Sequence, residues 1–428
     1  MKKQLVLLLT IAIFVSPVLA AAEEIRLTLD EAITIALRDN REVLLRAEDV
    51  KKAKAKISEA RASIFPSLTL NATLSDTRSL YGKDVDAYSS HIGAKQILYN
   101  SGQVVNAIKI NEYNYTATQA ILDKAKLDII LAVKQAFYAL LLSDKFVAIN
   151  KQILDNTNEH LAVIQARFAN GESSESELIK IRSSLANVLE AYETSRNQIQ
   201  AAQALLNNLL SFDKEVGVLP QGEFTYAPKE IAYDQAFLQA MQSRPEIKQL
   251  SAQQKMTEKS LDVVKANNRP QVYASWDYYS GSRSGAGSAA AATPSKNWND
   301  YNVVGITVSW PIFDGWLTKA KVDQAIIDVK EAELLKQKTT RDIALELKTA
   351  YLDLRDAIEK IKSQAKQTAV YKDNLSVFQE KYNAGIVSEL DVHDAQVSYD
   401  IALFNQIQAN YDYVVAKAKF DKATGGAI

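Results

Sequence analysis

Two long stretches of this sequence contain neither glycine nor proline, from Gln103 to Asn170 and from Trp316 to Ala384. Glycine and proline are the residues that most often interrupt helices, and these stretches are rich in alanine, leucine, lysine, glutamate and glutamine. An unbroken helix of that size would extend about 100 Å, several times the length of an ordinary globular helix. The stretches therefore predict long helical rods rather than a series of small globular domains.

Residues that favour helix packing recur at every seventh position along these rods and along the segments that follow them. An ordinary 3.6-residue period would drift away from a fixed stripe over so many repeats. Side-by-side coiled-coil packing is therefore favoured over its alternative, ordinary amphipathic helices. A column of alanines would allow close approach of neighbouring helices. Three of the columns are Val133, Leu140, Val147, Leu154, Leu161 and Phe168; Leu347, Leu354, Ile361, Thr368, Leu375 and Tyr382; and Ala395, Ala402, Ala409, Ala416 and Ala423.

The second half of the chain repeats the first. The segment "EAITIALRDNREV" aligns with "QAFLQAMQSRPEI", and "RFANGESSESEL" aligns with "KYNAGIVSELDV". These alignments place Pro66 on Pro270 and Gly171 on Gly385. We infer a tandem duplication. The predicted organisation is a signal peptide at 1–22, a first structural repeat at 23–216, an inter-repeat linker at 217–230 and a second structural repeat at 231–428.

Each repeat carries two segments in which apolar and polar residues alternate. The segments after Pro66 and Pro270 and the segment at 303–312 alternate clearly, and the segment at 90–99 alternates more weakly. Segments of about ten residues with one apolar face are typical of strands in outer-membrane barrels, although any half-buried antiparallel strand has the same pattern. Four strands cannot close a barrel, and open strand edges are not tolerated in lipid. Two copies would give a filled barrel, whereas three copies would give twelve strands with room for a pore.

The first residues have the features of an export signal. Lys2 and Lys3 precede an apolar run, and small residues at 20–22 offer cleavage sites. The run is too short for the alternative, a membrane anchor, which needs roughly 20 apolar residues. The mature chain is therefore expected in the periplasm, outside the cell, or in an outer membrane as strands.

The composition argues against several classes of function. A formal net charge of −1 gives no basic field for nucleic acid. The absence of cysteine excludes disulfides, thiolate metal sites, cysteine nucleophiles and a lipidated N-terminal cysteine. The three histidines are far apart in sequence, and the common hydrolase and phosphate-binding motifs are absent. We therefore expect a protein that is not an enzyme, with no catalytic residue, cofactor or metal site.

The duplicated layout, the segment "VSWPIFDG" at 308–315 and the paired hairpins "RFANGESSESEL" and "KYNAGIVSELDV" resemble the TolC-type outer membrane factors. The resemblance covers essentially the whole mature chain. It implies a mostly helical α+β fold, in which each chain contributes four strands to a trimeric 12-stranded transmembrane β-barrel. The barrel would be continued by a long α-helical coiled-coil tunnel in the periplasm.

The resemblance also implies a function and partners. The chain would be an outer membrane channel subunit, forming a homotrimeric exit duct for a tripartite efflux pump. A periplasmic adaptor protein, an inner-membrane transporter of the RND or ABC type and outer membrane lipid would be its partners. Three alternatives remain open at this point: the exit duct of a type I secretion system, and two non-channel proteins, a periplasmic helical spacer and an adaptor.

By the same resemblance, the glycine hairpins form the periplasmic tips of the tunnel and meet the adaptor. Glycine there suits a left-handed helix cap, and a serine three residues later suits the start of the next helix. The alternative is that these hairpins are only turns. The expected adaptor-contact residues are Phe168, Gly171, Ser174, Tyr382, Gly385 and Ser388.

The resemblance further implies that acidic residues close to these hairpins ring the tunnel entrance. Asp391 and Asp394 are one helical turn apart and share a face, and the resemblance gives Glu177 a related position. Rings of carboxylates favour cations, whereas the plainer reading is a solvated helix face. The resemblance assigns Tyr382 to entrance closure. It also implies an arginine where this chain has Val387, so that closing contact is missing.

Overall fold

The computed structural model describes residues 24–80, 83–212, 216–227, 232–284 and 299–426. The predicted signal peptide at 1–22 therefore lies outside the described residues. The chain divides into two units, and each is described by itself. The first unit comprises residues 1–36 and 133–225, and the second comprises residues 37–132 and 226–428.

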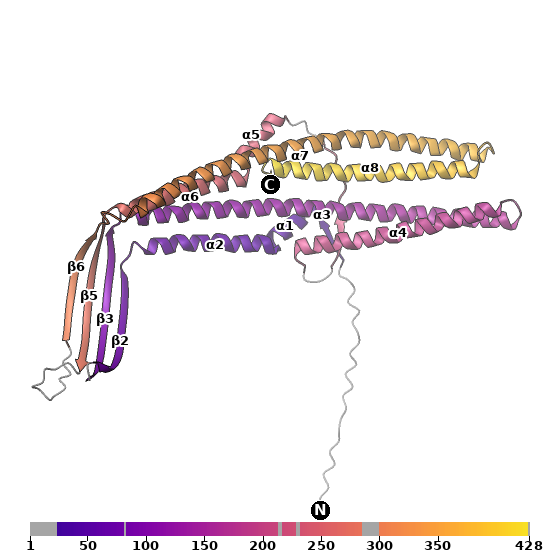
Figure 1. Ribbon diagram of the computed structural model, residues 1–428. Helices are drawn as coiled ribbons and strands as arrows, with labels where there is room; N and C mark the ends of the chain where they lie inside the picture. Colours follow the sequence, from indigo (N-terminus) through magenta and orange to yellow (C-terminus); the bar gives the residue numbers. More distant parts are fainter. Residues whose placement is uncertain (1–23, 81–82, 213–215, 228–231, 285–298, 427–428) are drawn as a thin grey trace, which may run out of the picture. The chain divides into compact units, whose positions relative to one another are not determined.

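The two halves of the chain contain the same succession of long elements (Figure 1). Each half has two shorter helices, two antiparallel strands, a helix of 67 residues and a further long helix. The first half contains β1 (Glu24–Thr28), α1 (Leu29–Asp39), α2 (Arg41–Ala62), β2 (Ser67–Leu80), β3 (Lys83–Tyr99), α3 (Gln103–Ala169), α4 (Glu175–Leu210) and β4 (Gly217–Gln221). The second half contains α5 (Tyr233–Ser243), α6 (Pro245–Lys265), the 3₁₀ turn η1 (Ala266–Asn268), β5 (Gln271–Ser284), β6 (Asn299–Ser309), α7 (Leu317–Asn383) and α8 (Glu389–Ala423).

The first unit joins a helical hairpin to a short sheet. Strands β1 and β4 pair in parallel, and the side chain of Val218 is fully buried. The side-chain amide of Asn207 on α4 donates to the carbonyl oxygen of Val216 at 2.9 Å, which fixes the start of β4 against the helix. Ile164 on α3 packs against Leu178 on α4 near the turn between the helices. The stretch predicted as an inter-repeat linker thus contains a paired strand, β4.

The second unit holds one antiparallel sheet in the order β2-β3-β5-β6. The segments predicted after Pro66 and Pro270 and at 90–99 lie in β2, β5 and β3, whereas the segment predicted at 303–312 runs three residues past the end of β6 at Ser309. The central pair β3 and β5 joins the two repeats, with Ile92 opposite Tyr278 and Ala94 opposite Trp276. In the described sheet, β2 and β6 each have a neighbour on one side only.

Two faces of different chemistry follow from the period-two alternation of strands. On one face of the sheet, the side chains of Leu68, Leu70, Val304, Ile306 and Val308 are all strongly exposed, Val304 at 78%. The register places Leu68 and Val304 in one row across the four strands. The opposite face carries mostly polar and aromatic residues. A large apolar surface that is open in a single chain indicates contact with lipid or with another chain.

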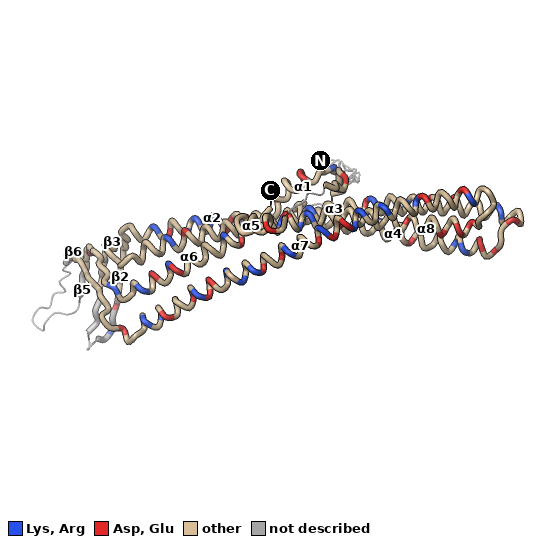
Figure 2. Tube along the Cα trace, turned by 90° about the horizontal axis from the view of Figure 1, so that it is seen from above, with Lys and Arg blue, Asp and Glu red and all other residues tan. Residues whose placement is uncertain are grey.

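Helices α7 and α8 of the second unit form an antiparallel hairpin (Figure 1). The alanine column predicted on α8 is buried at every position from Ala395 to Ala423. The column from Leu347 to Leu375 on α7 is buried too, and Tyr382 at its end is half-buried. Alanine has no side chain beyond Cβ, so it permits close helix approach. The predicted coiled-coil packing is confirmed for this hairpin. Charged residues of both signs recur along α7 (Figure 2).

A buried arginine links α6, α7 and the end of α8. Arg244 donates to Glu246 on α6 at 3.1 Å and to Glu346 on α7 at 2.5 Å. Its remaining nitrogen lies 3.3 Å from the carbonyl oxygen of Lys422 and 3.4 Å from that of Ala423. The last carbonyls of a helix lack partners within the helix, so this guanidinium satisfies the C-terminus of α8 and neutralises its dipole.

Candidate functional site

The two helical tips have the same backbone geometry. Gly171 has a φ of 76° and Gly385 a φ of 74°, the left-handed conformation expected for a helix-ending glycine. At the second tip, the amide of Gly385 donates to the carbonyl of Tyr382 and the amide of Ile386 donates to that of Lys381, both at 2.9 Å. At the first tip, the amides of Gly171 and Glu172 donate to the carbonyls of Phe168 and Arg167 at 3.0 and 2.8 Å. Both turns are Schellman motifs.

A capping box opens the helix that follows each turn. The Ser174 hydroxyl accepts from the amide of Glu177, and the Glu177 carboxylate accepts from the amide of Ser174. At the second tip, Ser388 and Asp391 make the same reciprocal pair. The capping role predicted for both serines is confirmed. Each box satisfies backbone donors that the first helical turn would otherwise leave open.

Two of the three predicted entrance acids are therefore engaged in their own helices. Asp391 accepts from the Ser388 hydroxyl at 2.7 Å and from its amide at 2.9 Å, and these bonds lower the pKa of the Asp391 carboxyl. Glu177 accepts from the Ser173 hydroxyl at 2.5 Å, and this bond, followed by the amide of Ser174, lowers the pKa of the Glu177 carboxyl. Both groups are thus held as anions.

The third acid, Asp394, is exposed on α8 one turn beyond Asp391. It stands outside the capping box. Tyr382 and Val387 are both half-buried beside the second turn. In the second unit, Tyr382, Gly385, Ser388, Asp391 and Asp394 thus lie within one tip. Phe168, Gly171, Ser174 and Glu177 lie within the tip of the first unit.

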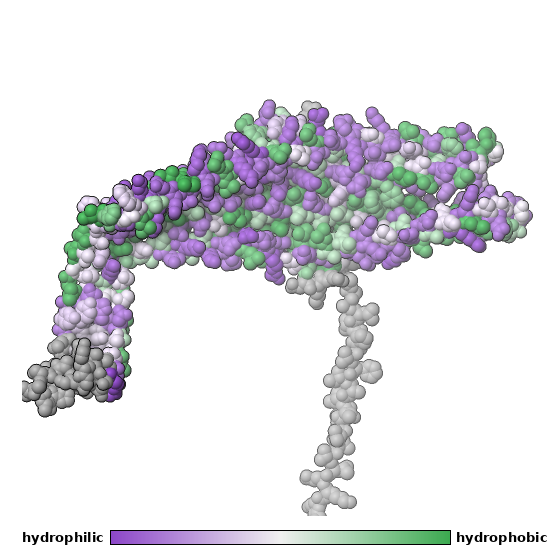
Figure 3. Space-filling model, viewed as in Figure 1, coloured by the Kyte–Doolittle hydropathy of each residue, from purple (hydrophilic) through white to green (hydrophobic). Residues whose placement is uncertain are grey.

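A second candidate surface lies where the sheet meets the helices (Figure 3). The alternation of exposed apolar residues on β6 continues past the strand through Trp310 and Ile312, and Phe313 is exposed beside them. Trp310 Nε1 donates to the carbonyl oxygen of Asn268 at 3.1 Å, which fixes the indole. Trp316 has a φ of 69° and opens α7. Aromatic residues of this kind are typical of the boundary between membrane and water.

The described residues contain no group of three or more acidic or histidine side chains arranged to hold a metal ion. No helix within the described ranges is both long enough and apolar enough to cross a membrane.

The capping role of the acids was missed by the sequence reasoning. Its signal was present, since serine followed three residues later by glutamate or aspartate is the pattern of a capping box. "SESE" at 174–177 and "SELD" at 388–391 both contain it.

The sequence and fold match known proteins over most of the chain. The family described as Outer membrane efflux protein matches residues 32–211 and 237–426, once in each repeat. The probable outer membrane lipoprotein SilC of Salmonella typhimurium is 21% identical over 404 residues, covering 91% of this chain and 84% of SilC. The outer membrane protein TolC of Escherichia coli (strain K12) is 20% identical over 396 residues, covering 90% of this chain and 80% of TolC. The crystal structure of CusC has a TM-score of 0.77 at 19% identity and covers 93% of this chain and 92% of CusC.

The chain belongs to the outer membrane efflux protein family. It is an outer membrane efflux channel protein with a TolC- and CusC-like fold and a periplasmic extension, and it is not an enzyme. The family resemblance drawn from the sequence is thereby confirmed.

Proposed function

We propose that three copies of this chain share one barrel and one periplasmic tunnel, which serves as the exit duct of a tripartite efflux pump. The observation that carries the proposal is the sheet, because its two outer strands, β2 and β6, have open edges and one of its faces is apolar. Open edges are not tolerated in lipid, so they pair with the edges of other copies. Three copies provide twelve strands, as in the trimers of TolC-type homologues.

The tips are the proposed contact with the periplasmic adaptor. Phe168 and Tyr382 occupy equivalent positions in the two Schellman turns, and Phe168 is exposed. Two equivalent turns per chain give six tips in a trimer. The adaptor in turn connects the duct to an inner-membrane transporter of the RND or ABC type.

The entrance is proposed to select cations mainly through Asp394. Asp391 and Glu177 contribute negative charge but are tied into their capping boxes. Because the arginine expected at the entrance is replaced by Val387, we assign closure to Tyr382 and to contacts other than an ion pair at that position.

We propose that the barrel alone holds the protein in the outer membrane. SilC is described as a probable lipoprotein, but the present sequence has no cysteine to carry a lipid. Metabolic labelling with a fatty acid is therefore expected to leave this protein unlabelled.

Single-channel recording tests the entrance assignment. Asp394→Asn is expected to lower cation selectivity and block by multivalent cations, and Asp391→Ala combined with Asp394→Ala to lower both further. Asp356→Asn, an exposed carboxylate on α7 far from the tip, is the matched control and should leave both unchanged. Unchanged selectivity and block in the double variant would reject the entrance ring.

A further inference from the structure

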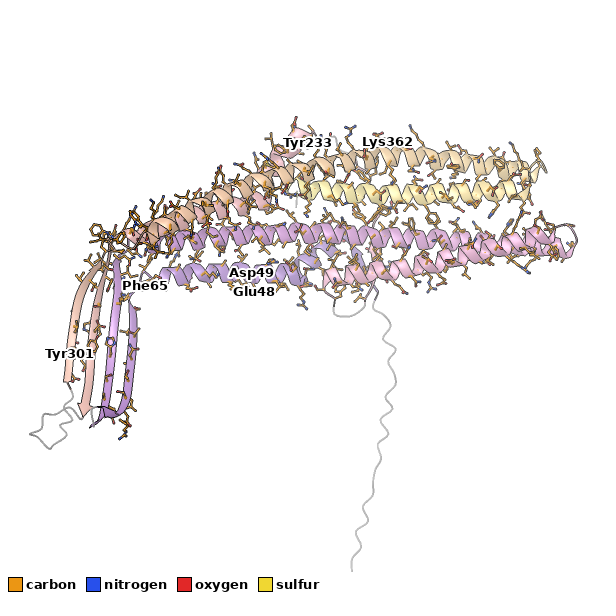
Figure 4. All side chains as sticks on the ribbon, in the orientation of Figure 1. Glu48, Asp49, Phe65, Tyr233, Tyr301 and Lys362 are labelled. Atoms are coloured by element: carbon orange, nitrogen blue, oxygen red, sulfur yellow. The ribbon has the colours of Figure 1, made fainter. Side chains whose placement is uncertain are left out.

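Three side-chain rings stand in a row across neighbouring strands on the polar face of the sheet. The register sets His91 on β3 opposite Tyr279 on β5, and Tyr279 opposite Tyr301 on β6. The centroids of the His91 and Tyr279 rings are 4.4 Å apart with the planes at 13°, and those of Tyr279 and Tyr301 are 4.9 Å apart at 16°. Tyr301 is labelled on β6 in Figure 4. The stack fixes the orientation of the imidazole.

A carboxylate completes this arrangement. His91 Nε2 lies 2.8 Å from Asp277 Oδ1, and the two side chains are 27% and 23% exposed. Asp277 is opposite Gly93 in the register. A Cβ atom at Gly93 would lie 2.9 Å from Asp277 Oδ1 and 3.1 Å from His91 Cε1. The missing side chain at Gly93 is therefore what gives the pair its space.

Strand alternation places this pair on the face opposite Leu68, Trp276 and Val304, which form the apolar surface. If the apolar face meets lipid, His91 and Asp277 face the lumen. The pair then belongs to the pore, far along the chain from the periplasmic tips.

Few other described groups on the polar face can carry charge. The neighbour of His91 on β2 is Asn71, which does not titrate. The titratable and charged described side chains that share this face with His91 are Lys95, Tyr273, Asp277, Tyr279 and Tyr301. Lys95 lies on β3 with its Nζ 4.1 Å from the centre of the Tyr273 ring.

The charges in this group balance while the imidazole is neutral, because Lys95 and Asp277 cancel. Protonation of His91 leaves one net positive charge in each copy. Imidazole is the side chain that ordinarily changes its charge between about pH 5 and pH 8. Three copies around one lumen would together add three positive charges when their His91 side chains are protonated.

We propose that His91 and Asp277 form a second charge-selectivity site for small inorganic ions, located inside the barrel. The pore favours anions more strongly when His91 is protonated than when it is neutral. This inference rests on the proposed shared barrel, and it adds a site that is separate from the acids of the tunnel entrance.

The contribution of His91 can be isolated by mutation, because the whole sequence contains only three histidines. His160 lies on α3 and His393 on α8, both outside the sheet. The reversal potential of the reconstituted channel is measured in a potassium chloride gradient at about pH 8 and about pH 5.5, the range in which imidazole titrates. The ratio of potassium to chloride permeability should fall about twofold in the wild-type channel on acidification, an effect of fixed charge in a confined pore.

His91→Gln should remove this pH response and hold the ratio near its alkaline value. His91→Lys, which fixes the positive charge, should hold it near its acidic value at both pH values. Asp277→Asn should shift the ratio toward chloride at both pH values. The matched controls His160→Gln and His393→Gln should retain the wild-type response.

A full pH response in His91→Gln, or its loss in His393→Gln instead, would overturn the inference while leaving the channel intact. An absence of pH response in the wild-type channel would overturn it as well. A wild-type protein that forms no conducting pore at all would instead contradict the proposed function, so the two failures can be told apart.

Discussion

The Thr368 hydroxyl on α7 donates a hydrogen bond to the carbonyl oxygen of Ala402 on α8 at 3.1 Å. The carbonyl oxygen of Gln364 in the same helix as Thr368 lies 2.9 Å from this hydroxyl, so the two carbonyls share its single hydrogen. A side chain this short reaches a neighbouring backbone only where two helices lie very close together. Ala402 belongs to the buried alanine column of α8, so this hydrogen bond lies in the packing interface between α7 and α8.

Enlarging the alanine column should destabilise the hairpin. Ala402→Leu adds three carbon atoms where there is no space, and overpacking of this kind costs about 1–3 kcal/mol. Thermal unfolding of the purified protein, followed by circular dichroism, measures the effect. Ala369→Leu on the exposed side of α7 is the matched control. Equal unfolding temperatures for the two variants would contradict close packing along this column.

Removing the buried arginine should weaken the junction of α6, α7 and α8. Arg244→Ala leaves Glu246 and the last carbonyls of α8 without their cation, and breaking a buried charge pair costs about 3–5 kcal/mol. Glu346 is half-exposed, so water solvates its carboxylate in the variant. We therefore expect a loss of stability at the lower end of that range. Urea denaturation is the measurement, with exposed Arg341→Ala on α7 as control. A loss no larger than that of the control would show that Arg244 has no structural role.

Substitution of the tip glycines should strain the backbone without creating a steric clash. A Cβ atom on Gly385 would meet nothing within 4 Å, so Gly385→Ala incurs only the penalty of a left-handed backbone, about 1–2 kcal/mol. Gly385→Asn should cost less, since asparagine tolerates this conformation better. Hydrogen exchange of the amides of Gly385 and Ile386 reports local opening. If alanine and asparagine open the turn equally, the strain explanation is wrong.

Acid should loosen the start of α8. The pKa of Asp391 is lowered by its bonds from Ser388, so its contribution to stability is fully present above the unfolded value of about 3.9. That contribution is lost as the pH falls through the lower folded value. Hydrogen exchange at the first turn of α8, corrected for the intrinsic rate, should therefore be unchanged between about pH 7 and pH 5 and should increase in stronger acid. Ser388→Ala should open the turn at neutral pH already, and equal protection at all pH values would contradict this account.

Much of the fold was predictable because it rests on regular patterns. The absence of glycine and proline set the two long helices, and Gly171 and Gly385 marked their ends. Alternation located the four strands, and the alanine column of α8 is buried as expected. These features repeat along the chain, so a few mismatched residues do not obscure them.

Other features depend on contacts that no local pattern encodes. His91 and Asp277 are 186 positions apart, and only the register of β3 and β5 brings them together. The sequence around Arg244 is like that of a surface arginine. Its role depends on the C-terminus of α8, which lies beside it only in the folded chain. Strand β4 is five residues long and lies within a stretch with the glycine and proline content of a linker, so its pairing with β1 gave no signal.

The candidate site at the helical tips was predicted only in part, for a different reason. The sequence located the tips and their acids, and the serines were expected to cap. The second half of each capping box, the carboxylate that returns to the serine amide, was overlooked for Glu177 and Asp391. In each box the same carboxylate caps the helix and contributes negative charge at the tip. Its position in the sequence does not distinguish these two roles.

The mass of the native complex in isolated outer membranes tests the central claim most directly. Inner and outer membranes are separated, the outer fraction is extracted in mild detergent, and the protein mass of the complex is measured. The account predicts a particle of three times the mass of the mature chain in the outer membrane fraction. A monomer in the periplasmic fraction would contradict the shared barrel and the duct built on it.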